Sequence, residues 1–261
     1  MDGYKTALIT GASSGIGETF AKALAAKGMD LVLVARSEDK LRTLAKKLAE
    51  VHSRRVEVVT ADLSLAGSAE KVRAATQALG MPVDLLINNA GFGTSGSFHR
   101  LDPARERQEV QLNCAAVVDM TRTFLPAMVD ARHGGLINIA SMAAFQPLPY
   151  MTTYAATKAF VLAFTEGLRG EVARKGVKVL AVCPGPVDTP FFEATGSAKL
   201  RKAVPDLLMM SSESVVTQSL RAFRMNRGVV VPGTGNKLVA ATAKLTPRWL
   251  LTPATARVMK R

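Results

Sequence analysis

The segment Lys5–Gly17 reads KTALITGASSGIG and joins a short apolar run to a glycine-rich turn. The run Lys5–Thr10 predicts a β-strand, and the residues after the turn, to about Lys27, predict a helix. This order is typical of a loop that holds the pyrophosphate of a dinucleotide, because glycines let the backbone approach closely and a helix N-terminus favours negative charge. The spacing G-x-x-x-G-x-G differs from the common G-x-G-x-x-G, so an ordinary glycine-rich loop is the alternative.

Apolar runs and helical stretches alternate along the rest of the chain, whose 261 residues and 48% hydrophobic content suit one α/β domain with a sizeable core. This alternation predicts a doubly wound (Rossmann) parallel sheet of about seven strands with helices on both faces. Besides Lys5–Thr10, the predicted strands are Asp30–Ala35, Arg55–Thr60, Asp84–Ile87, Leu136–Ala140, Val177–Cys183 and Gly228–Val231. The later predicted helices are Glu38–Val51, Gly67–Leu79, Pro103–Ala131, a segment capped by Thr152 or Thr153 that ends near Lys175, and Ser212–Met225.

The chain divides by composition into two parts. We expect a catalytic domain over residues 1–235, with an irregular substrate lid at 186–212, and a basic amphipathic extension over 236–261. The chain carries 34 Lys and Arg against 21 Asp and Glu, a net charge of +13, and no acidic residue follows Glu213. A basic amphipathic helix can lie on an anionic membrane surface. The alternative is a terminal helix that packs on its own domain or on a partner subunit. The sequence shows nothing specific to nucleic acid.

The cysteines and the N-terminus bear on the compartment. Cys114 and Cys183 are isolated and lack the spacing of metal ligands, so we expect free thiols in a reducing compartment and no metal site. The N-terminal sequence MDGYKTALITGASSG has an acid at position 2 and does not resemble a signal peptide. No apolar run approaches the roughly 18 residues that a membrane span needs. We therefore expect a cytoplasmic protein, with peripheral membrane contact as a further hypothesis.

Polar residues follow several predicted strands, at the carboxyl edge where doubly wound sheets bind their ligands. Asp62 and Leu63 follow the third strand, Asn89–Gly91 follow the fourth, and Ser141 follows the fifth. Proline cannot continue a central strand, so Pro184–Gly185 turn the chain out of the sheet at the same edge. These residues are expected to gather around one ligand.

Arg36 ends the second predicted strand, about 20 residues past the glycines, where a dinucleotide fold reads the adenosine ribose. An acid at this place binds the ribose 2′-hydroxyl, whereas an arginine accommodates a 2′-phosphate through its forked guanidinium. Arg36 therefore favours NADP(H) over NAD(H). The alternative is an exposed arginine that precedes the helix Glu38–Val51.

Tyr154 and Lys158 stand four residues apart on a predicted helix, so they share one face, opposite the strand end that carries Ser141. A tyrosine with an ordinary pKa of about 10 holds only about 0.1% phenolate at neutral pH. A neighbouring cation favours the phenolate, at about 1.4 kcal/mol for each unit by which the pKa falls. The pair with Ser141 therefore predicts an acid–base site, and a solvated Tyr–Lys pair is the alternative.

Asn113 lies within an otherwise apolar face of the predicted helix Pro103–Ala131. A buried asparagine needs hydrogen-bond partners. It either bridges to a neighbouring backbone or holds a water in an active site, and the residues around it do not decide between the two.

Taken in order, these motifs resemble the short-chain dehydrogenase/reductase family in its short single-domain form, over residues 5 to about 232. The resemblance implies that Tyr154 is the general acid or base, that Lys158 lowers the pKa of Tyr154, that Ser141 holds the substrate oxygen and that Asn113 holds a relay water. It also implies the cofactor contacts, which are Gly11, Ser13, Ser14, Gly15, Ile16, Gly17, Arg36, Asp62, Leu63, Asn89, Ala90, Gly91, Tyr154, Lys158, Pro184, Gly185, Val187 and Thr189.

The function that this resemblance implies is hydride transfer between NADP(H) and a carbonyl or alcohol substrate. The pairs Phe191–Phe192 and Met209–Met210 in the lid favour a lipophilic or acyl substrate. One alternative is a non-catalytic NADP(H)-binding or membrane-surface interaction protein that uses the basic extension. Another is a nucleotide-sugar epimerase or dehydratase, although the chain leaves little room for the larger substrate portion of such enzymes. We expect a homodimer or homotetramer that pairs through the helices of Asn113 and Tyr154.

Overall fold

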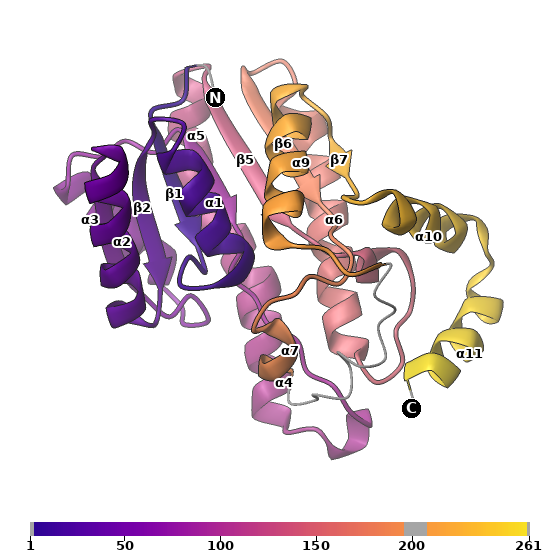
Figure 1. Ribbon diagram of the computed structural model, residues 1–261. Coiled ribbons are helices and arrows are strands. Elements are labelled where there is room, and N and C mark those ends of the chain that lie inside the picture. Colours follow the sequence, from indigo (N-terminus) through magenta and orange to yellow (C-terminus); the bar gives the residue numbers. More distant parts are fainter. Residues whose placement is uncertain (1–2, 196–207, 260–261) are drawn as a thin grey trace.

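The computed structural model describes residues 3–195 and 208–259, and over these ranges the chain forms a seven-stranded parallel sheet in the order β3-β2-β1-β4-β5-β6-β7 (Figure 1). This confirms the predicted doubly wound fold. The connection from β3 crosses back to place β4 beside β1, so a crevice opens at the carboxyl ends of these two strands. The strands are β1 (Thr6–Thr10), β2 (Asp30–Ala35), β3 (Val56–Thr60), β4 (Leu85–Asn88), β5 (Gly134–Ile139), β6 (Val177–Val182) and β7 (Val229–Val230).

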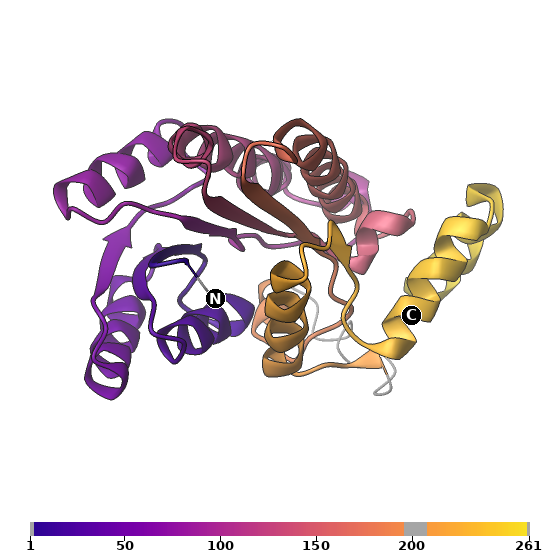
Figure 2. The same cartoon turned by 90° about the horizontal axis from the view of Figure 1, so that it is seen from above.

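Helices cover both faces of the sheet, as Figure 2 shows from above. One face packs on α1 (Gly15–Ala25), α2 (Glu38–His52) and α9 (Ser212–Arg224). The other face packs on α3 (Ser68–Ala78), α5 (Ala116–Asp130) and α6 (Thr152–Val172). Central strands are buried on both faces, which explains why β1, β4 and β5 read as continuous apolar runs rather than as alternating ones.

The helix predicted over Pro103–Ala131 is interrupted. It consists of α4 (Pro103–Val110), a π-helical turn η2 (Gln111–Ala115) and α5, and Asn113 lies fully buried within η2. A π turn inserts an extra residue into the helical repeat and is found mostly at functional sites. The sequence between Val110 and Ala116 contains no glycine or proline, so no local helix breaker marks the interruption.

The start of α6 also differs from the prediction. The helix begins at Thr152, but the residue that precedes it is Met151 and no side chain caps the helix. The hydroxyl of Thr153 instead donates to the carboxylate of Glu106 on α4. The predicted cap by Thr152 or Thr153 is therefore wrong, because a tertiary partner takes the hydroxyl.

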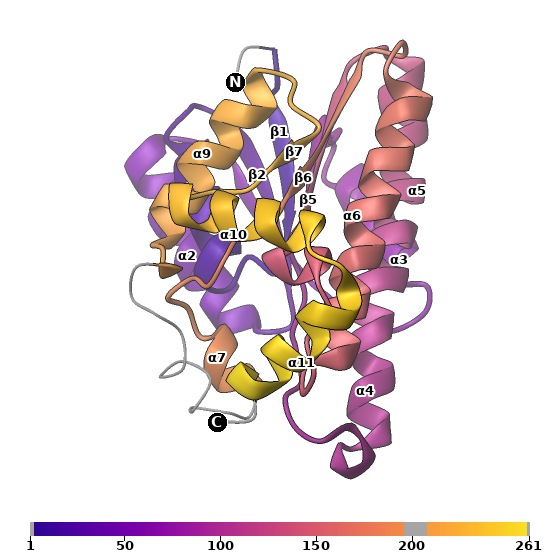
Figure 3. The same cartoon turned by 90° about the vertical axis from the view of Figure 1, so that its right-hand side faces the viewer.

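The C-terminal segment forms α10 (Thr234–Leu245) and α11 (Arg248–Met259), which lie beyond β7 (Figures 1 and 3). The expected boundary between residues 235 and 236 falls in the first turn of α10, where Asn236 is buried against Gly185. Farther on, Thr255 Oγ1 donates to the carbonyl of Pro147 at 3.2 Å. The segment therefore packs on its own domain. Across residues 3–195 and 208–259, no helix is long and apolar enough to cross a membrane.

The expected lid over residues 186–212 is described only in part. After the sixth strand, Val187 forms a parallel bridge with Met210, and the backbone N–H of Met210 donates to the carbonyl of Pro186 at 3.0 Å. The short helix α7 (Phe191–Ala194) lies between these partners. Residues 196–207 of the expected lid lie outside the described ranges.

Candidate active site

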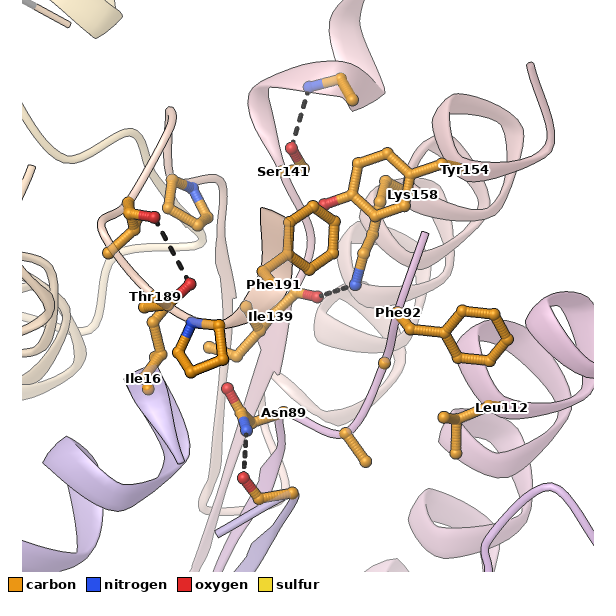
Figure 4. A pocket seen from close by; sticks show the side chains of 18 of the residues that line it. Ile16, Asn89, Phe92, Leu112, Ile139, Ser141, Tyr154, Lys158, Thr189 and Phe191 are labelled. Carbon is orange, nitrogen blue, oxygen red and sulfur yellow. Dashed lines mark hydrogen bonds between the residues drawn. The ribbon is translucent and has the colours of Figure 1, made fainter. Parts of the chain in front are cut away.

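A cavity of about 590 Å³ opens at the carboxyl edge of the sheet. Its walls come from the glycine turn after β1, the ends of β2 to β6, the first turns of α6, and the C-terminal helices. Figure 4 shows Tyr154, Lys158 and Ser141 on one side of this cavity, with Thr189 and Ile16 opposite. Every residue predicted to contact cofactor lines the cavity except Gly17, and Asn113 lies behind its wall.

The glycine turn fits a close-packed phosphate loop. Gly11 and Gly15 adopt φ values of +65° and +56°, which residues with a Cβ rarely adopt. A Cβ on Gly17 would lie 2.3 Å from the carbonyl oxygen of Gly11, so only glycine lets α1 approach the strand end this closely. The N-terminus of α1, with Ser13, Ser14 and Ile16 around it, faces the cavity, and its unpaired N–H groups suit a pyrophosphate.

Asn89 joins the end of β4 to this turn. Its Nδ2 donates to the carbonyls of Thr10 and Gly11 at 2.9 and 3.1 Å, while its backbone N–H and that of Ala90 donate to Thr10 Oγ1 at 2.9 and 3.0 Å. The side chain therefore fixes two strand ends relative to each other. It holds the floor of the cavity in place, and Ala90 and Gly91 line that floor.

Arg36 and Asp62 lie together at the far end of the cavity, beside Leu63. An Arg36 Nη1 to Asp62 Oδ2 distance of 3.9 Å makes a weak, largely exposed ion pair, since 61% of the Arg36 side chain is accessible. Burial would raise the pKa of Asp62, but hydrogen bonds from Ser64 and the charge of Arg36 hold it below its ordinary value. A cation and a carboxylate therefore flank the place where the adenosine end of a dinucleotide would lie.

Ser141, Tyr154 and Lys158 converge where β5 ends. Ser141 Oγ accepts a hydrogen bond from the N–H of Ala143 at 3.1 Å. The Tyr154 hydroxyl points towards Ser141 in Figure 4, and the Ser141 side chain lowers the pKa of Tyr154. Lys158 Nζ lies 5.8 Å from the centre of the Tyr154 ring and donates to the carbonyl of Ile139 at 2.9 Å. A phenol, a hydroxyl and an amine thus share one side of the cavity.

Burial dominates the protonation of this group. Burial raises the pKa of Tyr154 to about 12. The Ser141 side chain lowers this pKa, and the charge of Glu109 raises it further. Burial also lowers the pKa of Lys158 to about 8. In the protein alone, the pKa of Tyr154 is therefore raised and not lowered as we expected from Lys158. Tyr154 keeps its proton at neutral pH.

Asn113 supports the wall behind this group. Its Oδ1 accepts from the N–H of Phe92 at 3.1 Å, and its Nδ2 donates to the carbonyl of Phe92 at 2.8 Å and to Thr157 Oγ1 at 3.0 Å. The side chain bridges to a neighbouring backbone, which is one of the two roles that the sequence left open. The role of holding a water stays a prediction.

The loop after β6 closes the cavity opposite Tyr154. The carbonyl of Pro184 accepts from the N–H of Met142 at 2.8 Å, and Gly185 and Val187 continue the wall. A Cβ on Gly15 would lie 3.1 Å from Thr189 Cγ2, so Thr189 faces the glycine turn directly. The cavity therefore narrows between the start of α1 and this loop.

The remaining wall is apolar and was missed in part by sequence reasoning. Phe191 was expected in the lid, and its ring lies 5.3 Å from that of Tyr154. The C-terminal helices also reach the cavity, a contact with no local sequence signal because it depends on how the chain folds back. The apolar residues of this wall are Met142, Leu148, Met151, Phe191, Phe192, Leu208, Val239 and Met259.

Comparisons with known proteins point to one family. Residues 5–200 match the sequence model of the family described as short chain dehydrogenase. The chain is also 32% identical over 251 residues to the very-long-chain 3-oxoacyl-CoA reductase of Rattus norvegicus, and the match covers 94% of this chain and 76% of that protein.

Solved structures agree with this result. A short-chain dehydrogenase from Sphingobium yanoikuyae in complex with NADPH is 33% identical, with a TM-score of 0.82 over 92% of this chain and 94% of that one. A 3-ketoacyl-(acyl-carrier-protein) reductase from Brucella melitensis complexed with NADH is 28% identical, with a TM-score of 0.77 over 88% of this chain and 96% of that one. These two relatives bind different nicotinamide nucleotides.

Proposed function

The chain belongs to the short-chain dehydrogenase family and is an oxidoreductase that acts on hydroxyl or carbonyl groups, and we propose that it reduces a lipophilic carbonyl compound, of the 3-oxoacyl type, with NADPH. The observation that carries this proposal is that Ser141, Tyr154 and Lys158 line the same cavity as the glycine turn after β1 and as a set of apolar side chains, here called the apolar chamber.

The cavity suits a nicotinamide dinucleotide in one orientation, with the adenosine end beside Arg36 and the nicotinamide end beside Lys158. The N-terminus of α1 would hold the pyrophosphate, Asp62 would contact the adenine and Arg36 would bind a 2′-phosphate. Thr189 and Lys158 would contact the carboxamide and the nicotinamide ribose at the other end. NADPH, when bound, would supply the hydride.

Tyr154 would act as the general acid of the reduction. Because burial keeps its pKa at about 12, the hydroxyl is protonated at neutral pH, which is the form that a proton donor needs. Ser141 would hold the same substrate oxygen by a hydrogen bond. In the oxidative direction Tyr154 would have to lose its proton, and the positive charge of Lys158 would favour the phenolate.

The apolar chamber supports a lipophilic substrate. Two phenylalanines of the lid and residues of α10 and α11 surround it, and burial of each methylene of an acyl chain contributes about 0.8 kcal/mol. The relative from Rattus norvegicus, named as a very-long-chain 3-oxoacyl-CoA reductase, supports the same class.

Turnover of a 3-oxoacyl ester series with NADPH tests the proposal. We expect KM to fall as the acyl chain lengthens, and we expect Tyr154→Phe to lose at least about 100-fold in kcat while still binding NADPH. Tyr150→Phe is the control, since Tyr150 does not line the cavity. Equal rates for wild type and Tyr154→Phe would contradict the acid–base role.

The C-terminal helices favour a second property, contact with an anionic membrane surface. Leu238, Leu245 and Trp249 are 67%, 85% and 74% exposed, and Lys237 and Arg248 flank them on the same segment. Such a surface suits an anionic bilayer, which would also deliver a lipophilic substrate to a cavity that α10 and α11 help to line.

Co-sedimentation with vesicles tests this contact. Wild type is expected to bind anionic but not zwitterionic vesicles, and Leu245→Ser with Trp249→Ser is expected to abolish binding. Val51→Ser, which removes from α2 an apolar side chain that is 65% exposed, is the control. Equal binding by all variants would exclude the tail as the contact.

We also propose that the protein is a homo-oligomer that pairs through α4, α5 and α6. Phe160 on α6 is 42% exposed, and its ring stacks on that of Phe164 at 6.0 Å, while Val110 on α4 is 44% exposed. Light scattering after gel filtration tests this, and a monomeric mass at micromolar concentration would contradict it.

A further inference from the structure

Arg105 is a cation on the cavity wall to which the proposed reaction gives no role. It lies on α4, is half-buried, and lines the cavity together with Arg36 and Lys158. Its guanidinium lies over the ring of Phe92, with 3.7 Å between Cζ and the ring centre. A side chain that is already held against the wall loses less conformational freedom when a ligand binds, so Arg105 is prepared to bind an anion.

The charge of Arg105 has no carboxylate partner within residues 3–195 and 208–259, where the ion pairs involve other residues. Its hydrogen bond goes to a neutral amide instead, since Nη1 donates to Gln108 Oε1 at 2.8 Å. A guanidinium carries several N–H donors in a fixed fork. The donors that Gln108 does not use are therefore available to a ligand in the cavity.

A chain of hydrogen bonds joins Arg105 to Asp62. Gln108 Nε2 donates to Ser64 Oγ in a long contact of 3.5 Å. Ser64 in turn donates to Asp62 Oδ1, from its hydroxyl at 2.7 Å and from its backbone N–H at 2.9 Å. Arg36 Nη1 lies 3.9 Å from Oδ2, the other oxygen of this carboxylate. The two arginines are therefore linked to different oxygens of Asp62, one directly and one through two side chains.

This link places Arg105 towards the end of the cavity where the adenosine half of a dinucleotide would lie. Arg36 follows β2, whereas Arg105 lies over Phe92, which comes shortly after β4. In the sheet, β1 lies between β2 and β4. The two arginines thus approach the cavity from either side of β1, whose glycine turn suits a pyrophosphate.

We propose that Arg105 is a second arginine, besides Arg36, that binds a phosphate of the nicotinamide nucleotide. The proposal rests on the proposed function, because it takes a dinucleotide as the occupant of this end of the cavity. The guanidinium fork matches two oxygens of a phosphate with two parallel N–H donors. Gln108 is the positioning residue of this contact, since its amide oxygen holds Nη1. The phosphate is either the pyrophosphate, which NADH and NADPH share, or the 2′-phosphate, which only NADPH carries.

Fluorescence titration with NADPH and with NADH, without substrate, tests the contact. Arg105→Met removes the charge and keeps an apolar side chain beside Phe92, and we expect it to weaken NADPH binding about tenfold. The loss should shrink as salt is added, because salt screens the attraction between the arginine and the phosphate. NADH binding should fall equally if the contact is to the pyrophosphate, and stay unchanged if it is to the 2′-phosphate. Arg107→Met is the matched control, since Arg107 lies on the same helix but is exposed and does not line the cavity.

Gln108→Glu provides a second variant that keeps the shape of the side chain. It places a carboxylate beside Arg105, which competes with phosphate for the guanidinium, so we expect it to weaken the same nucleotides as Arg105→Met. Unchanged binding of both nucleotides by folded Arg105→Met would overturn the proposal.

The substrate is the other source of phosphate, and its arm of the experiment uses two thioesters. If Arg105→Met binds both nucleotides normally but raises KM for a 3-oxoacyl-CoA and not for a phosphate-free 3-oxoacyl thioester, the arginine serves the substrate and the proposal is wrong. If wild type binds NADPH through Arg105 but reduces no carbonyl compound, the proposed function fails and the nucleotide contact stands.

Discussion

Lys158 Nζ donates a hydrogen bond to the carbonyl oxygen of Ile139 at 2.9 Å. Ile139 is the last residue of β5 and lies two residues before Ser141, so this bond fixes α6 against the strand end that carries the serine. The amine is buried and would otherwise have little to hold it in place. Burial, and not this hydrogen bond, lowers the pKa of Lys158 to about 8 and makes its charged form costly.

Replacing Lys158 by methionine should therefore stabilise the protein while abolishing activity. Since the pKa of Lys158 falls to about 8 from an ordinary 10.5, burying the charged form is unfavourable at pH 7, and we expect Lys158→Met to unfold about 1–3 kcal/mol less readily there. Between about pH 8 and 10.5 the unfolded chain binds more protons at this site than the folded one. Wild type should therefore gain stability relative to the variant as the pH rises through this window.

Urea titrations at several pH values measure this difference. A difference that stays constant from pH 7 to pH 10.5 would contradict the lowered pKa of Lys158. Loss of activity alone would not support it, because any change at this position removes the amine.

Arg36→Ala should weaken the binding of NADPH by about 10- to 100-fold, as expected from loss of charge-assisted hydrogen bonds worth about 1.5–3 kcal/mol, and should change NADH binding little. Nicotinamide fluorescence during titration of the purified protein measures both affinities. Arg42→Ala is the control. Arg42 lies on α2, the helix that follows Arg36, and forms an ion pair with Glu38. If wild type binds NADH as tightly as NADPH, Arg36 does not select the cofactor.

Gly17→Ala should destabilise the protein by about 1–3 kcal/mol and weaken nucleotide binding, because its Cβ would overlap the carbonyl oxygen of Gly11. Gly167→Ala in α6 is the matched control. A Cβ there meets nothing within 4 Å, so higher helix propensity should stabilise the protein by up to about 1 kcal/mol. Thermal unfolding of both variants measures these changes. We expect the melting temperature to fall in Gly17→Ala and to rise in Gly167→Ala.

Asn113→Ala should destabilise the protein by about 2–4 kcal/mol, since it leaves both backbone groups of Phe92 unpaired in a buried site. Part of this destabilisation comes from the lost hydrogen bond between Asn113 Nδ2 and Thr157 Oγ1. Adding Thr157→Val to Asn113→Ala should therefore cost less than the sum of the single changes. Strict additivity in a urea-unfolding cycle would show that the two side chains are not coupled.

The sequence alone determined the order of strands and helices along the chain and most of the residues that line the cavity. Apolar runs such as Ile9 and its neighbours, and the glycines of the first turn, have physical meaning over a few residues, so they can be read locally. Carboxyl ends of parallel strands meet at one edge, so residues as distant as Asp62 and Ser141 could be assigned to a single cavity in advance.

Tertiary structure alone decided the π turn at Asn113, the hydrogen-bonded link between Arg105 and Asp62, and the use of α10 and α11 as a cavity wall. Each depends on contacts between residues far apart in the chain, such as Asn113 with Thr157 and Thr255 with Pro147. Protonation is decided in the same way. The sequence places a lysine near Tyr154, but only the packed structure shows that burial raises the pKa of Tyr154 and lowers that of Lys158.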